Sequence, residues 1–329
     1  MSWYAAAPLF LVSLVVTLAA ARLFARRLDR LGVRFGFPEA LIGLLTALAA
    51  DGPEISSALF ALFRGAHSVS VGVLVGSNAF NLAAMIGLSA LLAGCVRLHR
   101  ETLLLEGVFG AAITLLAAAV LLRWLGGAPA ALLAAVVIVP YLLVVIGGSE
   151  LLLHRHGSRG LRRSLAQRPA RVRESEPGER PTHHLLGLVV VDLALILAGS
   201  AGMVQAALAL GDRWHVSRAA LGVLILAPLT SIPNAMTGVR LGRAGRAAAL
   251  VGETFNSNTI NLGFGVIVPS LLVTFTAVTT LGKLQLAWLV AATLFTLGAL
   301  ARRGGMRRSD AVMLVVVYFA FVGGTLVGS

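Results

Sequence analysis

Long apolar segments separated by short polar turns follow one another along the whole sequence. Each is about 20 residues or longer, enough for a helix to cross the ~30 Å hydrocarbon core of a bilayer. Backbone groups in lipid must satisfy their own hydrogen bonds, so each segment is predicted to be a helix. The pattern predicts an all-α polytopic membrane protein with ten transmembrane helices, at residues 5–25, 37–63, 67–93, 103–124, 128–149, 184–210, 217–240, 246–272, 283–301 and 310–327.

The composition also indicates a protein whose main solvent is lipid. Hydrophobic residues make up 58% of the 329 residues and charged residues only 12%, against about 25% charged in soluble domains. The net charge is +13, but the basic residues form short clusters between apolar segments rather than one face with interleaved aromatics, so no nucleic-acid partner is expected. Cys95 is the only cysteine, which excludes an intramolecular disulfide.

One polar stretch divides the chain into two halves. Residues 151–183 are rich in Arg, Glu, Pro and Gly and too poor in apolar residues to form a core, so they are predicted to be a flexible basic linker. The first half then comprises residues 1–150 and the second residues 184–329, with five predicted helices in each.

Charge asymmetry predicts the orientation in the membrane. Alternate loops carry 22 basic residues on one side, including the linker, and 5 on the other. By the positive-inside rule the linker is cytoplasmic and both termini lie outside the cytoplasm, in a bacterial inner membrane. Because five is an odd number, the second half enters the membrane inverted relative to the first.

A repeated motif supports a duplication. Ser77-Asn78-Ala79-Phe80-Asn81 recurs as Ser257-Asn258-Thr259-Ile260-Asn261, and Pro53-Glu54 recurs as Pro233-Asn234, both at an offset of 180 residues. The repeats cover about residues 37–93 and 217–272. Inverted repeats with polar, interrupted helices in matching positions are typical of secondary transporters, so the second, third, seventh and eighth helices are expected to be broken.

Two carboxylates lie within the second apolar segment. Pro53 interrupts that segment between Asp51 and Glu54, and a proline inside a helix removes a backbone hydrogen bond. A carboxylate at the bilayer centre costs at least about 2.5 kcal/mol, so both are expected to face a cavity, a counter-charge or an ion. The alternative is that both lie in a loop; the matching interruption at Pro233 argues against it.

The asparagines of the repeated motif form two pairs. Asn78 and Asn81, like Asn258 and Asn261, are three residues apart and share a helical face. With one or two carboxylates, their amide oxygens form a set of hard ligands suited to Ca²⁺ or Na⁺. The alternative is interhelical hydrogen bonding combined with close packing at small residues.

Other acidic residues carry weaker expectations. Asp192 is interpreted as a proton relay or a boundary carboxylate, and Glu253 as a residue that reaches the site or lies at headgroup level. Glu106, Glu150 and Asp310 lie near segment ends and are expected to be interfacial.

The repeats resemble the α-repeats of the calcium:cation antiporter superfamily, which includes sodium/calcium exchangers. Family repeats read as Ile-Gly-Leu, then Gly-Thr-Ser-x-Pro-Glu, then Gly-Ser-Asn-x-x-Asn. In both halves 25 residues separate the proline from the first asparagine. The matching residues are Ile42-Gly43-Leu44, Pro53-Glu54 and Gly76 to Asn81 in the first repeat, and Leu221-Gly222, Thr230 to Asn234 and Ser257 to Asn261 in the second.

The resemblance implies a set of ion ligands. By family position, Glu54, Ser77, Asn81, Thr230, Ser231 and Ser257 would coordinate the cation. Asn234 occupies the place of a second acidic residue without its charge, Asp51 restores the carboxylate count, and Asn256 replaces a glycine. Asp51, Asn78, Asn234, Asn258 and Asn261 complete the predicted site. Since two adjacent carboxylates repel, one is expected to hold a proton when no cation is bound.

The function implied is a secondary active antiporter that exchanges Ca²⁺ or a related cation for Na⁺ or H⁺ by alternating access. Neither an enzyme nor a cofactor is expected, since no phosphate loop, nucleophile elbow or metal-hydrolase spacing occurs. A non-transporting scaffold or sensor with the same fold is the alternative, because one of the two central acids is missing. A channel is a third reading.

Overall fold

A computed structural model describes residues 3–37, 39–93, 95–97, 103–143, 182–302 and 305–328. Almost all of the predicted linker, residues 151–181, lies outside these ranges, as does Glu150. Within the described residues the protein is all-helical apart from two strands of two residues each.

The first half contains α1 (Trp3–Arg34), α2 (Glu39–Ala50), α3 (Gly52–Phe63), α4 (His67–Asn81), η1 (Leu82–Gly87), α5 (Leu88–Ala93), β1 (Cys95–Val96), η2 (Leu103–Val108), α7 (Phe109–Leu121) and α8 (Gly127–Leu142). The second contains α11 (Thr182–Trp214), α12 (Arg218–Ala220), η4 (Leu221–Leu226), α13 (Ala227–Thr230), α14 (Ile232–Arg243), α15 (Ala247–Leu262), η5 (Gly263–Ile267), η6 (Pro269–Leu271), α16 (Thr280–Ala301), β2 (Met306–Arg307) and α17 (Arg308–Val327).

Several helices have the length and composition to cross a membrane. Among the described residues, five meet both criteria as single helices: Tyr4–Arg34, His67–Leu92, Thr182–Trp214, Thr280–Ala301 and Arg308–Val327. A sixth span is obtained if Arg218–Thr230 and Ile232–Arg243, bent by 51° at their junction, are counted together. Glu106–Leu121 and Gly127–Leu142 are apolar but shorter. All ten predicted segments fall on helical structure, while ten complete spans remain a prediction.

The second and seventh predicted helices are interrupted, but the third and eighth are not. Helix α2 ends at Ala50 and α3 begins at Gly52, and α13 ends at Thr230 before α14 begins at Ile232. In contrast, α4 passes directly into the π-helical η1, and α15 into the π-helical η5. The wider π turn accommodates an extra residue without ending the helix, so helix continues past Asn81 and Leu262.

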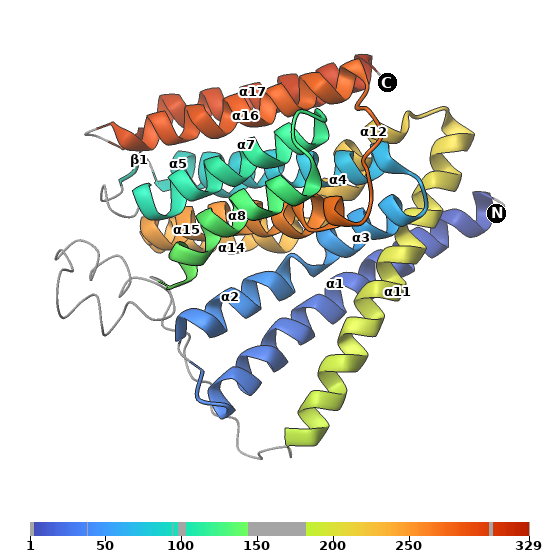
Figure 1. Cartoon of the computed structure of the whole chain (residues 1–329), viewed down its shortest axis with the longest axis horizontal. Helices are drawn as coiled ribbons and strands as arrows, with labels where there is room; N and C mark the ends of the chain where they lie inside the picture. The colour runs from blue at the N-terminus through green and yellow to red at the C-terminus, as the bar shows by residue number, and fades with distance from the viewer. Residues whose placement is uncertain are drawn as a thin grey trace.

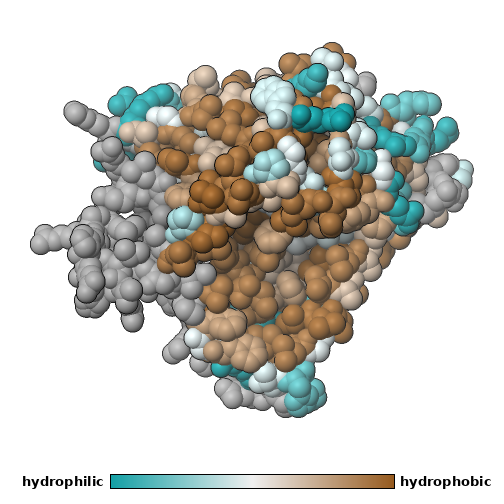
Figure 2. Space-filling model, viewed as in Figure 1, coloured by the Kyte–Doolittle hydropathy of each residue, from teal (hydrophilic) through white to brown (hydrophobic). Residues whose placement is uncertain are grey.

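The interrupted helices lie in the middle of the bundle (Figure 1), with α3, α4, α14 and α15 close to one another. Helices α16 and α17 lie side by side along one edge, and α1 packs mainly against α11 along the other. Apolar side chains cover the flanks of the helices, and hydrophilic ones gather mostly near helix ends (Figure 2).

Close packing of the two halves depends on glycine. A Cβ added at Gly72 of α4 would lie 2.8 Å from the carbonyl oxygen of Ala219, and one at Gly222 of η4 would lie 2.5 Å from that of Val69. Only glycine allows the two backbones to approach this closely. The first α-repeat is therefore fixed directly against the second.

Candidate functional site

The two helix interruptions have the same backbone conformation. Asp51, between α2 and α3, has φ −81° and ψ −1°, and Ser231, between α13 and α14, has φ −87° and ψ 0°. Each is followed two residues later by a proline in the first turn of the next helix. Proline has no N–H, so the carbonyl groups of Ala49 and Leu229 lose their α-helical donors. Both interruptions thus add backbone oxygens to the centre of the protein.

The two carboxylates of the first interruption meet the polar side chains of the second. Asn234 donates from Nδ2 to Asp51 Oδ1 at 2.9 Å and lies 3.4 Å from Glu54 Oε1. Ser231 donates to the same Glu54 oxygen at 3.0 Å, and Ser257 of α15 donates to Asp51 Oδ1 at 2.6 Å. These described donors are hydroxyl and amide groups, so neither carboxylate is neutralised by a basic side chain among them.

The four asparagines of the repeated motif are bonded to one another in a reciprocal pattern. Asn78 donates to the backbone carbonyl of Asn258 at 3.3 Å, and Asn258 to that of Asn78 at 3.2 Å. Asn81 donates to Asn258 Oδ1 at 3.2 Å and Asn261 to Asn78 Oδ1 at 3.4 Å. The pattern is unchanged when the repeats are exchanged, which is what related contacts at an offset of 180 residues require.

One oxygen on each of five site residues has no hydrogen-bond donor. They are Asp51 Oδ2, Glu54 Oε2, Ser77 Oγ, Asn81 Oδ1 and Asn261 Oδ1. Their side chains are at most 1% exposed. A buried oxygen left without a partner costs about 1–3 kcal/mol, so five in one region indicate a place where a cation supplies the missing interaction. Carboxylate, amide and hydroxyl oxygens are the ligands that Ca²⁺ and Na⁺ prefer.

All eleven predicted site residues are buried, at most 4% exposed, but their contacts differ. Thr230 donates to carbonyl groups in its own turn, Leu226 and Ala227, and is bound to no other site side chain in the described structure. Asn78 and Asn258 spend their amide hydrogens on each other's backbone, as the interhelical packing alternative expects.

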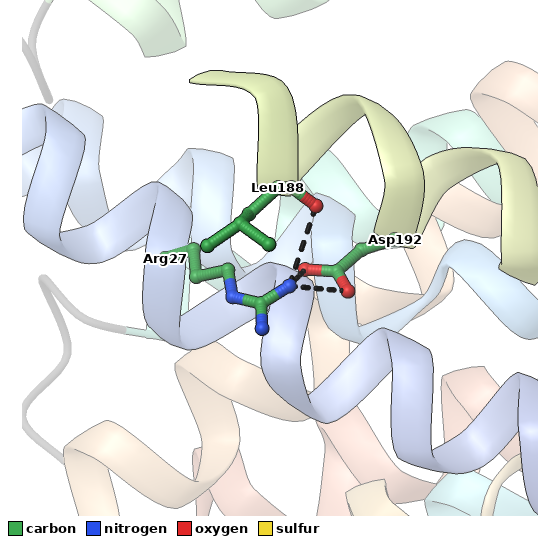
Figure 3. Close-up of polar contacts among 3 residues, drawn as sticks. All are labelled: Arg27, Leu188 and Asp192. Carbon is green, nitrogen blue, oxygen red and sulfur yellow. Dashed lines mark hydrogen bonds and ion pairs between the residues drawn. The ribbon is translucent and has the colours of Figure 1, made fainter. Parts of the chain in front are cut away.

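The structure corrects the expectations for two acidic residues. Glu106 was expected at an interface, but it is 5% exposed and lies in hydrogen-bond contact with Tyr141 of α8. Asp192 is 1% exposed, so the boundary interpretation is wrong. Both carboxylate oxygens of Asp192 lie 2.6 Å from Arg27 Nη1, which also donates to the carbonyl of Leu188 at 3.3 Å (Figure 3). This ion pair joins α1 to α11.

Two hydrogen-bonded groups near the site were not predicted. Ser56 of α3 and Ser200 of α11 lie 2.6 Å apart, which links α11 to the helix that carries Glu54. Tyr141 contacts Asn256 Oδ1 at 2.7 Å. A serine or tyrosine within an apolar helix is the only sequence signal for such contacts, and it names no partner.

Comparison with known proteins decides the family. The model of the family described as sodium/calcium exchanger protein matches residues 5–147 and 184–327. The chain belongs to the sodium/calcium exchanger family. The match covers both halves and omits the stretch between them. An integral membrane protein of this family is a transporter rather than a conventional enzyme.

Two curated relatives of the exchanger chain are bacterial. It is 27% identical over 318 residues to the putative antiporter CaxA of Alkalimonas amylolytica, covering 95% of each chain. It is 24% identical over 241 residues to the inner membrane protein YrbG of Escherichia coli K12, covering 72% of this chain and 71% of the relative.

Two solved structures share the fold of the exchanger chain. The sodium-calcium exchanger NCX_Mj, soaked with Na⁺ and Sr²⁺, matches with a TM-score of 0.61 at 18% identity, covering 98% of this chain and 99% of that one. Native YfkE matches with a TM-score of 0.64 at 16% identity, covering 97% and 92%. At these identities the likeness concerns the fold alone.

Proposed function

We propose that the protein is a secondary active antiporter that exchanges Ca²⁺, or a related cation, for Na⁺ or H⁺ at the site between the two helix interruptions. The observation that carries this proposal is the pair of buried carboxylates, Asp51 and Glu54, surrounded by buried oxygens without donors. The family and the antiporter relative support the same reaction class.

The donor-free oxygens define the direct ligands. Asp51 Oδ2, Glu54 Oε2, Ser77 Oγ, Asn81 Oδ1 and Asn261 Oδ1 contribute five oxygens, and Ca²⁺ takes 6–8. Carbonyl groups at the interruptions or water complete the shell. Ser231, Asn234 and Ser257 hold the other carboxylate oxygens in place, whereas Asn78 and Asn258 join the repeats.

The proposed architecture is two inverted five-helix halves, residues 1–150 and 184–329, joined by a cytoplasmic linker at 151–183, with both termini outside the cytoplasm. Alternating access follows if the halves rock about the site. The reciprocal asparagine contacts, which are unchanged on exchange of the repeats, support this symmetry.

The test is a panel of ion gradients in proteoliposomes. Uptake of Ca²⁺, Mn²⁺ and Mg²⁺ is measured with an outward Na⁺, K⁺ or H⁺ gradient imposed one at a time. The proposal expects divalent uptake that stops when the Na⁺ or H⁺ gradient is removed. Uptake that proceeds under none of these gradients, or that needs only K⁺, contradicts it.

One observation favours a second function, a non-transporting scaffold or sensor. Asn234 lies where the family has a second acid, and its amide already occupies oxygens of both remaining carboxylates. A chain that has lost turnover would show no flux under any gradient, which the same panel detects.

A further inference from the structure

A second buried polar cluster lies outside the proposed ligands. It consists of Glu106 on η2, Tyr141 on α8 and Asn256 on α15. The Tyr141 hydroxyl lies 2.7 Å from Asn256 Oδ1 and 3.1 Å from Glu106 Oε2. Glu106 and Tyr141 are 5% and 8% exposed, and Gly252 of α15 leaves room for the Glu106 carboxyl, since a Cβ there would lie 3.5 Å from Glu106 Cδ. A carboxylate buried in a membrane helix indicates a functional site by default.

The duplicated scaffold does not require this cluster. At the offset of 180 residues, Glu106, Tyr141 and Asn256 correspond to Leu286, Phe321 and Gly76. The offset holds for these elements, because α7 ends at Leu121 and α16 at Ala301. The corresponding leucine and phenylalanine are buried in the apolar core. The second copy of the fold therefore packs without polar groups here, and the polar cluster is an addition of this chain.

The number of hydrogens available indicates where a proton binds. A tyrosine hydroxyl has one hydrogen and can donate to only one of its two neighbouring oxygens. If it donates to Asn256 Oδ1, the closer oxygen, Glu106 must be a carboxylic acid and donate to Tyr141. If Glu106 is ionised, Tyr141 donates to Glu106, and the Asn256 amide turns to donate its NH₂ to Tyr141. The distances as observed correspond to the protonated state.

The surroundings of Glu106 contain few other titratable groups. From α8 the titratable side chain is Tyr141, and from α15 it is Glu253. From α16, Leu297 packs against Gly107 beside Glu106. Lys283, the charged residue of α16, is 14 positions before Leu297, about 21 Å along a helix. The described neighbours thus offer Glu106 another carboxylate rather than a basic partner, which favours binding of a proton.

The cluster adjoins the proposed cation site through consecutive residues of α15. Asn256 accepts from Tyr141, and the next residue, Ser257, donates to Asp51 Oδ1 at 2.6 Å. A cation bound to Asp51 and Glu54 stabilises negative charge on a nearby carboxyl, and by reciprocity a proton on that carboxyl weakens cation binding.

We propose that Glu106, with Tyr141 and Asn256, is a proton-binding site of the transport cycle, so that this chain releases a proton from Glu106 when its cation binds. The inference rests on the proposed function and names one counter-ion for it. When the cation binds, the Glu106 O–H bond breaks, the proton passes to water, and the carboxylate accepts the Tyr141 hydrogen. The reverse transfer on the other side of the membrane restores the acid.

Proton release gives the direct test. Purified protein in weakly buffered detergent solution receives Ca²⁺, and released protons are measured with a pH-indicator dye. The wild type is expected to release protons, and Glu106→Gln about one fewer per molecule. Asp310→Asn, which removes a carboxyl paired with Arg302 at 2.9 Å, is the matched control and is expected to release as many as the wild type. Equal release from Glu106→Gln and wild type overturns the proposal, as does Ca²⁺ binding by the wild type without proton release.

An infrared measurement separates this proposal from the proposed function. The carbonyl stretch of a protonated carboxylic acid is expected in the cation-free wild type, reduced in Glu106→Gln and shifted in Tyr141→Phe, which keeps the ring but loses the hydroxyl. If calorimetry finds no cation binding, the proposed function fails, and the infrared band still decides whether Glu106 holds a proton. A band unchanged in both variants contradicts the assignment, and Tyr141→Phe provides the test if Glu106→Gln does not fold.

Discussion

At the scale of single residues, Asn234 determines how two carboxylates share one buried site. Its amide donates to Asp51 and Ser257 and lies within reach of Glu54. A second acid at this position would add a third negative charge and remove these donors. The substitution therefore stabilises the site without a cation, and it lowers the charge that a bound cation must balance.

Replacing Asn234 by aspartate tests this role. Without cations, Asn234→Asp is expected to lower the free energy of unfolding by about 3 kcal/mol, because buried carboxylates lose donors and gain a like charge. Added Ca²⁺ should then raise the thermal midpoint more than in the wild type. Gln285→Glu, another buried amide that bonds Thr325 at 3.1 Å, is the control and should show no larger response to Ca²⁺. Equal Ca²⁺ responses in Asn234→Asp and wild type would count against this role.

Two serines on one continuous helix form a matched pair. Ser77 has no donor or acceptor partner for its Oγ in the described structure, whereas Ser89 donates to the carbonyl of Gly238 at 2.9 Å. Ser77→Ala is expected to leave the thermal midpoint nearly unchanged but to weaken cation binding about tenfold, or ~1.4 kcal/mol. Ser89→Ala is expected to cost about 1 kcal/mol of stability with unchanged binding. Calorimetric titration and thermal unfolding distinguish the two, and the opposite pattern would refute the role of Ser77.

The sequence predicts which residues meet but not which atoms pair. Burial of a polar residue follows from its position in an apolar segment, so the candidate set could be listed before the structure. The bonding of Asn78 and Asn258 to each other's backbone depends on how closely the glycine-rich helices approach, which no local pattern encodes. Glu106 was misplaced for a similar reason, because its partners lie 35 and 150 positions away in sequence, at Tyr141 and Asn256.

At the scale of helices, prolines explain the interruptions and leave the π turns unexplained. Pro53 and Pro233 remove a backbone donor at equivalent places, so both interruptions could be predicted. The π-helical segments η1 and η5 follow Asn81 and Leu262, where no proline or charge marks them. They keep α4 and α15 continuous, contrary to the broken helices expected there.

The ion pair between α1 and α11 can be tested with a double-mutant cycle. Arg27 contacts Asp192, whose side chain is 2% exposed. Asp192→Asn and Arg27→Gln are each expected to lower the thermal midpoint, and the double variant should lose less than the sum. The coupling expected for a partly buried pair is about 1–3 kcal/mol. Strictly additive losses would mean that the pair does not join the two helices.

At the scale of the whole molecule, the two halves share a backbone plan but not a chemistry. The first half supplies Asp51, Glu54 and Glu106, and the second supplies neutral groups at the corresponding positions, Ser231, Asn234 and Leu286. Equivalent interruptions and reciprocal asparagine contacts keep the scaffold symmetric around them. Number, order and duplication of helices could be predicted from apolar periodicity and the repeated motif. The unequal charge of the halves is what distinguishes this exchanger, and it concentrates the cation chemistry on Glu54.

The most direct measurement of that claim is Ca²⁺ uptake by proteoliposomes containing the wild type or Glu54→Gln, with an outward Na⁺ or H⁺ gradient. Glutamine keeps the oxygen that accepts from Ser231 and removes only the charge, so the variant is expected to fold with a nearly unchanged thermal midpoint. The wild type should accumulate Ca²⁺ and Glu54→Gln should not. Uptake by Glu54→Gln at the wild-type rate would contradict the site and the function proposed from it.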